Sequence, residues 1–261
     1  MKFLLTAINA KFIHSNPAIY SLRAGVGEKL QPYVELAEFT INESLESILE
    51  GIWKRQPKVI GFSCYIWNWK LIREILTELP KILPDTEIWL GGPEVTYDGP
   101  GLLREFPQVT GIMVGEGEVT FREVLDHYVR EAESTGQSEQ QPEPDRIEQQ
   151  AADRAGTVAG KSVAERFGQI PGLCLASGYT APRELTDLTT LPFLYEDMEP
   201  FTNRIIYYET SRGCPYRCSY CLSSIDKKVR LRDIDVVKRE LQFFLDQNVK
   251  QVKFIDRTFN C

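Results

Sequence analysis

The first 130 residues alternate between short, continuously apolar runs and segments in which apolar residues recur every three or four positions. Runs of the first kind are expected to be buried strands, and segments of the second kind are expected to be amphipathic helices. The expected strands cover residues 2–8, 33–39, 58–63, 87–90 and 111–114, and the expected helices cover residues 17–29, 42–55, 67–79 and 119–130. Strands that alternate with helices imply a parallel sheet that is covered on both faces.

This alternation predicts an α/β fold in which the first 130 residues form a flavodoxin-like, doubly wound parallel sheet. In such a sheet the ligand site lies at the carboxyl ends of the strands. Ser63 stands at one of those ends, and Gly91 and Gly92 stand at the next. Because glycine lets the backbone approach a ligand closely, we expect a ligand site at this edge.

Residues at the strand end of Ser63 and at one further strand end support a wide, flat site. The indoles of Trp67 and Trp69 follow Ser63, and the segment 115–118 reads Gly-Glu-Gly-Glu. The alternative interpretation is that the glycines only turn the chain and the aromatic side chains only pack.

The second half of the chain changes in character twice. Residues 131–168 are rich in acidic and amide side chains and poor in large apolar ones, so we expect an acidic, disordered linker. Residues 169–203 are expected to bridge to a second unit, with a short strand and turn at their start. Residues 204–261 then contain an apolar strand, a cysteine-rich stretch, an amphipathic helix over 235–247 and a strand over 251–255.

Half of the six cysteines fall in one short stretch, as Cys214, Cys218 and Cys221. The neighbouring Gly213 and Pro215 favour a loop rather than a helix. Thiolates select iron–sulfur clusters, zinc or copper(I). Three thiolates are one ligand short of a closed zinc site, whereas a 4Fe-4S cluster bound by three would keep one iron open.

The other cysteines and the composition limit the remaining possibilities. Cys64 and Cys174 are expected to be small buried residues, and Cys261 is expected to be incidental. The net charge of −7 and the isoelectric point near 5.1 argue against a nucleic-acid surface. There is no apolar run of membrane-spanning length, and the apolar start is predicted to be a first strand rather than a signal peptide. We therefore expect a cytoplasmic protein, in which clustered thiols are metal ligands rather than disulfides.

The spacing C-x3-C-x2-C, the aromatic Tyr220 before its last cysteine and the strand before it resemble the radical S-adenosylmethionine (SAM) superfamily. That resemblance implies a 4Fe-4S cluster on Cys214, Cys218 and Cys221, with SAM on the open iron and Tyr220 near the adenine. It also implies a reductant such as ferredoxin or flavodoxin, whose electron cleaves SAM into methionine and a 5′-deoxyadenosyl radical.

The first module, joined to this stretch, resembles that of the cobalamin (B12)-binding radical SAM proteins. The strand ends Gly-Phe-Ser-Cys, Leu-Gly-Gly-Pro-Glu and Val-Gly-Glu-Gly-Glu carry this part of the resemblance. It implies that Ser63, Gly91 and Gly92 cradle cobalamin, and that the reaction is a methyl transfer or a carbon-centred rearrangement of an unknown substrate. His14 is not expected to ligate cobalt, because Phe12 stands where ligating cobalamin domains have an aspartate.

Residues 222–261 leave room for only one helix and one further strand. We therefore expect residues 204–261 to be an incomplete radical SAM (β/α) barrel, and the chain to resemble the amino-terminal half of the family. It would then be a truncated reading frame, an amino-terminal fragment, or part of a split enzyme that a second polypeptide completes. Two other functions stay open, a corrinoid-binding module that is inactive in radical chemistry and a structural zinc protein. No catalytic residue is assigned.

Overall fold

The computed structural model describes residues 1–134, 161–221 and 228–258. Its main sheet has the strand order β2-β1-β3-β4-β5-β6-β7, in which β1 to β5 are parallel and β6 and β7 are antiparallel. The strands are β1 (Phe3–Asn9), β2 (Val34–Thr40), β3 (Val59–Ser63), β4 (Glu87–Gly91), β5 (Val109–Met113), β6 (Leu173–Leu175) and β7 (Gly178–Tyr179). The order 2-1-3-4-5 confirms the predicted doubly wound, flavodoxin-like sheet.

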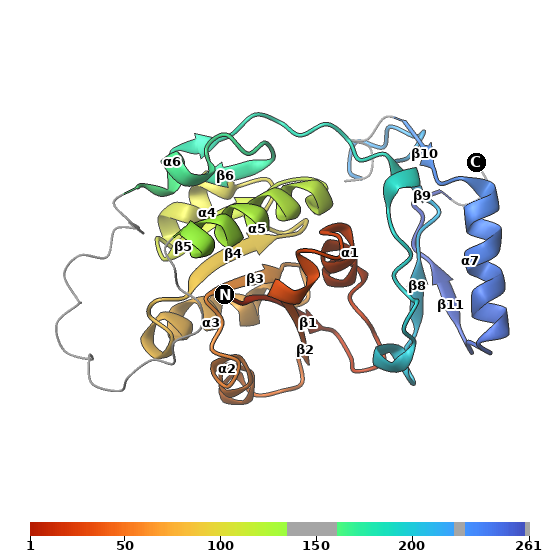
Figure 1. Cartoon of the computed structure of the whole chain (residues 1–261), viewed down its shortest axis with the longest axis horizontal. Helices are drawn as coiled ribbons and strands as arrows, with labels where there is room; N and C mark the ends of the chain where they lie inside the picture. The colour runs from red at the N-terminus through yellow and green to blue at the C-terminus, as the bar shows by residue number, and fades with distance from the viewer. Residues whose placement is uncertain (135–160, 222–227, 259–261) are drawn as a thin grey trace.

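Helices cover both faces of this sheet (Figure 1). They are α1 (Pro17–Gly25), α2 (Leu45–Trp53), α3 (Trp69–Ile82), α4 (Gly99–Glu105), α5 (Gly117–Ser134) and α6 (Val163–Phe167), with a 3-10 turn at Gln31–Tyr33. One core lies between the sheet and α2, α3 and α4, and the other lies between the sheet and α1, α5 and α6. Both cores are built from large aliphatic and aromatic side chains, so burial of apolar area is the main term that holds the module together.

Local sequence signals explain where α1 begins and why α4 was not predicted. The Asn16 side chain accepts a hydrogen bond from Ala18 N, and Pro17 occupies the first helical position, so α1 begins where predicted. It ends earlier than predicted, and Gly27 follows in the left-handed region with φ +78°. Helix α4 was not predicted, because its first residues, Gly-Pro-Gly, are typical of a turn.

The predicted linker of residues 131–168 is wrong at both of its ends. Helix α5 continues to Ser134, and α6 lies within the predicted linker. A reciprocal capping box between Ser162 and Glu165 starts α6, and the buried Arg166 side chain forms ion pairs with Glu87 and Glu131. The interval 135–160 lies outside the described residues. Strands β6 and β7, from the predicted bridge, add an antiparallel edge to the main sheet.

The second unit is a parallel β-α-β arrangement beside the first (Figure 1). It comprises β8 (Ile206–Tyr208), β9 (Ser211–Arg212), β10 (Arg230–Leu231), α7 (Ile234–Asp246) and β11 (Val252–Phe254), preceded by 3-10 turns at Leu188–Thr190 and Glu199–Phe201. Strand β8 pairs in parallel with β11 through the crossover helix α7, as the first two strands of a (β/α) barrel would. The Asp233 side chain caps α7 by accepting hydrogen bonds from the backbone amides of Asp235 and Val236.

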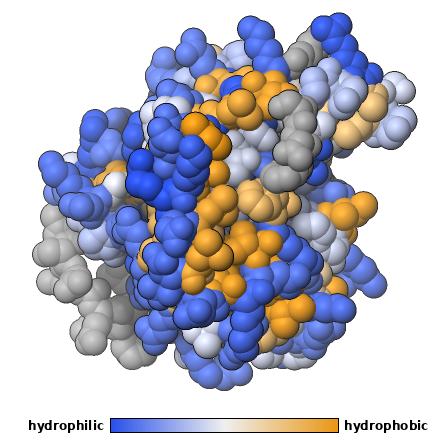
Figure 2. All heavy atoms as spheres, turned by 90° about the vertical axis from the view of Figure 1, so that its right-hand side faces the viewer, coloured by the Kyte–Doolittle hydropathy of each residue, from blue (hydrophilic) through white to orange (hydrophobic). Residues whose placement is uncertain are grey.

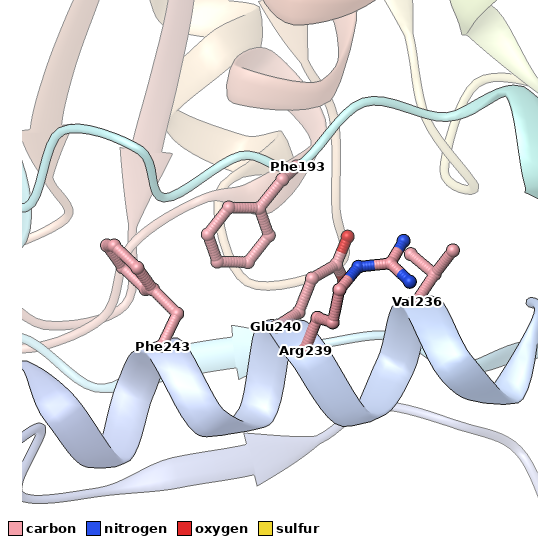
Figure 3. A pocket seen from close by; sticks show the side chains of 5 residues that line it. All are labelled: Phe193, Val236, Arg239, Glu240 and Phe243. Atoms are coloured by element: carbon pink, nitrogen blue, oxygen red, sulfur yellow. The ribbon is translucent and has the colours of Figure 1, made fainter.

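A separate apolar core joins α7 to the bridging segment, and it includes Tyr195, Phe201 and Phe244. An open hollow of about 270 Å³ lies on the outer side of α7. Figure 3 shows Phe193, from the bridging segment, opposite Phe243 of α7 in this hollow. Figure 2 shows that apolar side chains gather on the face of the molecule that carries α7 and β11.

Among the described residues, no helix is both long and apolar enough to cross a membrane.

Candidate functional site

A row of small side chains crosses three strands at the carboxyl edge of the main sheet. Ser63 is the register partner of Ala7 on β1 and of Gly91 on β4. A Cβ added at Gly91 would have its nearest neighbours 3.8 Å away, at Met113, which is an ordinary contact distance. The protein's own packing therefore does not require glycine at this position. The row forms a cradle that a larger side chain would fill, which fits the approach of a ligand to the backbone.

Gly92 has a different, local reason to be glycine. Its φ is +110°, and a Cβ there would lie 2.4 Å from the carbonyl oxygen of Cys64. For Gly92 the structure therefore supports the alternative interpretation, that the glycine lets the chain turn and pack. Cys64 is fully buried, and this burial raises the pKa of its thiol well above the ordinary value. Cys174 is also buried, so both cysteines are the small buried residues predicted.

A hydrogen-bonded loop between β1 and α1 borders the row. Asn16 Nδ2 donates to Ser63 Oγ over 3.2 Å, so the residue that caps α1 also orients the predicted ligand-binding serine. His14 lies in the same loop and is hydrogen-bonded through Nδ1 to the hydroxyl of Tyr207 on β8. This contact is consistent with the prediction that His14 is not a cobalt ligand.

The buried Glu38 organises this loop, and the sequence analysis missed it. Its carboxylate accepts hydrogen bonds from Asn9 Nδ2 at 2.6 Å, from Tyr20 Oη at 2.5 Å and from Arg204 Nη1 at 2.6 Å. Burial, followed by the contact with Glu38, raises the pKa of Tyr20, so its hydroxyl stays a donor. Because Arg204 belongs to the second unit, Glu38 ties that unit to the loop that borders the row.

The aromatic residues after β3 divide between the edge and the core. Trp67 is half-exposed and its ring stacks on Tyr65, with centroids 4.4 Å apart and planes 8° apart. Trp69, in contrast, packs against Phe106 on the core side of α3. Only Trp67 of the two predicted indoles therefore lies at the exposed edge. The buried Asn68 holds this turn by donating from Nδ2 to the carbonyls of Ile8 and Ser63.

The cysteine loop extends from a short antiparallel pair of strands, β9 and β10. Cys214 is buried, Cys218 is exposed, Cys221 is intermediate, and Tyr220 is 91% exposed. The number and the chemical type of the three cysteine thiols fit an iron–sulfur cluster with an open iron. Their placement does not show one, because among the described residues no three His, Cys, Asp or Glu side chains converge as a metal site.

Asp256, just after β11, fixes the chain that enters the cysteine loop. Its carboxylate accepts hydrogen bonds from the backbone amides of Thr210 and Ser211, each over 2.7 Å, and from the Thr210 hydroxyl over 2.5 Å. Three donors on one carboxylate hold the end of β8 against the end of β11. No local pattern in the sequence indicates this role, because the partners are about 45 residues apart.

The segment 115–118 binds arginines of the second unit. Glu116 forms ion pairs with Arg230 and Arg212, and Glu118 forms one with Arg212. The sequence analysis placed this segment among the strand ends of the ligand site. In the structure its carboxylates instead connect the sheet edge to the base of the cysteine loop.

Glu116 makes an acid-sensitive contribution to stability. Burial raises its pKa, but the hydrogen bonds from Arg230 and the Thr186 amide, with the charge of Arg212, outweigh burial and lower the pKa below its ordinary value of 4.5. A carboxyl group whose pKa is lower in the folded state stabilises fully above its unfolded pKa, and loses this effect as pH falls through its folded pKa. Urea denaturation should therefore show a gap in unfolding free energy between the native protein and Glu116→Gln that is largest near neutral pH and shrinks below pH 4.5. A gap that does not change with pH would contradict this assignment.

Comparison with known proteins agrees with this geometry. The model of the B12 binding domain family matches residues 4–125. The first module is a B12-binding domain. It includes the row of Ser63 and Gly91 and the loop that Glu38 organises, and it ends within α5. The complete chain resembles the B12-binding radical SAM proteins, as expected from its cysteine loop.

Three relatives share between a quarter and a third of their aligned residues with this chain. The 2-(S-pantetheinyl)-carbapenam-3-carboxylate methyltransferase of Streptantibioticus cattleyicolor is 27% identical over an alignment of 228 residues, and the match covers 83% of this chain and 29% of that protein. The cobalamin-dependent radical SAM methyltransferase TokK of Streptomyces tokunonensis is 28% identical, over 78% of this chain and 28% of TokK. The uncharacterized methyltransferase PH0819 of Pyrococcus horikoshii is 28% identical, over 83% of this chain and 43% of PH0819.

A solved structure shares the fold of nearly the whole chain. The cobalamin-dependent SAM radical enzyme OxsB, with aqua-cobalamin and SAM bound, superposes with a TM-score of 0.67 at 17% identity. The match covers 98% of this chain and 34% of OxsB. This chain therefore spans less than half the length of each of these proteins. The superposition supports the arrangement of the main sheet beside the β8-α7-β11 unit.

Proposed function

We propose that this chain carries the cobalamin site and the cluster loop of a cobalamin-dependent radical SAM methyltransferase. The observation that carries the proposal is the junction between the two candidate sites. The edge of the B12-binding domain and the base of the cysteine loop are joined by ion pairs of Arg212 with Glu116 and Glu118, whose side chains are between 9% and 16% exposed.

Cobalamin would lie at the carboxyl edge of the main sheet. The row at Ser63 and Gly91 leaves room at the backbone, and the half-exposed Trp67 offers a flat apolar face nearby in the chain. Membership of the first module in the B12-binding family supports this assignment. In this proposal Ser63 and Gly91 contact cobalamin directly, and Gly92 shapes the turn beside them.

The cluster would be held by Cys214, Cys218 and Cys221, with SAM on the open iron and Tyr220 near its adenine. When bound, the cluster supplies one electron that cleaves SAM, and cobalamin supplies a methyl carrier. The chain's own residues bind and position these groups, and Asp256 fixes the strand that leads into the loop. The names of the relatives favour methyl transfer over carbon-centred rearrangement.

Two partners follow from this proposal. The cluster needs a one-electron donor, for which a ferredoxin or flavodoxin is suitable. In the described part of the chain β11 pairs only with β8, which leaves its other edge open. We propose that further strand–helix units, on this protein or on a second polypeptide, pair with that edge and complete the barrel.

Binding of SAM tests the cluster assignment directly. The protein is reconstituted anaerobically with iron and sulfide and reduced with dithionite, and its electron paramagnetic resonance spectrum is recorded with and without SAM. Coordination of SAM to the open iron is expected to shift the g-values of the reduced cluster. A cluster whose spectrum does not respond to saturating SAM would count against the proposal.

A corrinoid-binding module without radical chemistry is the second candidate. It is favoured by one observation, that the cysteines do not converge as a metal site among the described residues. In that case the protein would bind cobalamin and fail to retain iron after reconstitution.

A further inference from the structure

Both arginines at the base of the cysteine loop reach the B12-binding domain. Arg212 of β9 and Arg230 of β10 are register partners, so they close the loop from its two sides. Arg212 Nη2 lies 2.6 Å from Glu118 Oε1, and Arg230 Nη1 donates to Glu116 Oε2 over 3.2 Å. Arg230 Nη1 also donates to the carbonyl oxygen of Thr186 over 2.6 Å. Two strands of one unit are thereby fixed to a single segment of the other.

The pair formed by Arg212 and Glu118 is well shielded from solvent. Side-chain exposure is 16% for Arg212 and 9% for Glu118. Glu118 Oε1 also accepts a hydrogen bond from Ser21 Oγ over 3.1 Å, and Arg212 Nε donates to Glu209 over 2.8 Å. Removing one member of a buried, hydrogen-bonded ion pair leaves an uncompensated charge, which is far more costly than losing a surface pair.

Arg212 is also the last strand residue before the cysteines. Gly213 separates it from Cys214 and has φ +91°, a turn that fixes where the chain goes next. The Cys214 side chain is buried, whereas Cys218, four residues on, is exposed. A shift of the Arg212 backbone therefore moves Cys214 directly and moves Cys218 through a longer, exposed segment.

We propose that Arg212, through its ion pair with Glu118, is a positioning residue that holds Cys214 in its buried place and ties the cysteine loop to the B12-binding domain. In this arrangement Cys214 and the edge of the main sheet at Gly91 are held in fixed positions relative to one another before any cofactor binds. The link to a cluster rests on the proposed function, whereas the placement of Cys214 does not.

Thiol reactivity in the metal-free protein tests this placement. Under anaerobic conditions the protein is pulsed with iodoacetamide, and the alkylation rate of each cysteine is measured by mass spectrometry. In the native protein Cys218 should react fast and Cys214 slowly. In Arg212→Gln, Cys214 should react at least about tenfold faster, because loss of a buried partner favours local opening. Glu118→Gln should raise the Cys214 rate in the same direction, and it provides a second test if Arg212→Gln folds poorly.

Arg166→Gln is the matched control. Arg166 is more deeply buried than Arg212 and likewise forms ion pairs with glutamates, here Glu87 and Glu131, but it lies on α6, away from the cysteine loop. Its loss should lower the stability of the protein and leave the Cys214 rate within about twofold of the native one. Equal acceleration in Arg166→Gln and Arg212→Gln would overturn the proposal, as would a native rate in both Arg212→Gln and Glu118→Gln.

Iron loading separates this inference from the proposed function. If the native protein takes up a cluster, Arg212→Gln should lose iron to a chelator at least about tenfold faster than Arg166→Gln does. If the native protein takes up no cluster, the proposed function fails, and the alkylation rates alone decide whether Arg212 positions Cys214.

Discussion

Alanine at Cys214, Cys218 and Cys221 together is expected to abolish iron binding by the reconstituted protein. The native protein should hold about four irons per chain with broad visible charge-transfer absorption, and the triple variant should hold essentially none. The reason is chemical, because the thiolates are the only iron ligands that this proposal places on the chain. Each single alanine variant should also lose most of its iron, since a cluster held by two thiolates is poorly retained.

Cys174→Ala is the control for this experiment. Cys174 is buried in the core of the first module, so its loss should leave the iron content unchanged and cost only about 1 kcal/mol of stability. Retention of all iron by the triple variant would remove the cluster from the proposal.

Valine at Gly91 is expected to weaken cobalamin binding by about tenfold or more, since overpacking by a few methyl groups typically costs 1–3 kcal/mol. A Cβ at Gly91 meets only ordinary contacts, so the first carbon of the valine side chain fits the fold, and thermal unfolding shows whether the two γ-methyl groups fit as well. Cobalamin affinity can be measured from the change in its visible spectrum on binding, with thermal unfolding recorded in parallel. A native affinity in Gly91→Val would place cobalamin elsewhere.

Alanine at the neighbouring Gly92 should have the opposite profile. Its positive φ and its approach to the Cys64 carbonyl make any side chain strained, at a cost of about 1–3 kcal/mol or more in the unfolding free energy. The difference in unfolding free energy between the native protein and Gly92→Ala should be the same with and without cobalamin, because the variant should keep its affinity for cobalamin. The two adjacent glycines thus separate a ligand-binding role from a structural one.

Local patterns in the sequence predicted most of the main fold. The strands of the doubly wound sheet, the start of α1 at Pro17, the buried Cys64 and the β8-α7-β11 unit all depend on short-range periodicity or on helix-start signals, which sequence shows directly. Helix α4 was missed, since a helix that starts with Gly-Pro-Gly carries a turn signal. The antiparallel β6 and β7 were expected as a short strand and turn, and the pairing of β6 with β5 is a long-range event.

The parts of the site that were missed all depend on distant partners. Glu38 and Arg204 are 166 positions apart, and Arg212 and Glu118 are 94 positions apart. A charged residue in a polar loop gives no local indication of whether it meets solvent, a ligand or another charge. For that reason the segment 115–118 suggested a ligand site, and only the fold showed that its carboxylates bind Arg212 and Arg230.

The central claim is that one chain holds both cofactors across the junction of its two units. The most direct measurement is elemental and cofactor analysis of a single sample, reconstituted anaerobically with iron, sulfide and cobalamin and then freed of unbound material by gel filtration. We expect about four irons, about four sulfides and about one cobalamin per chain, with no stoichiometric zinc. Cobalamin without iron would instead indicate a corrinoid-binding module, and zinc in place of iron would indicate a structural site, so either result would contradict the claim.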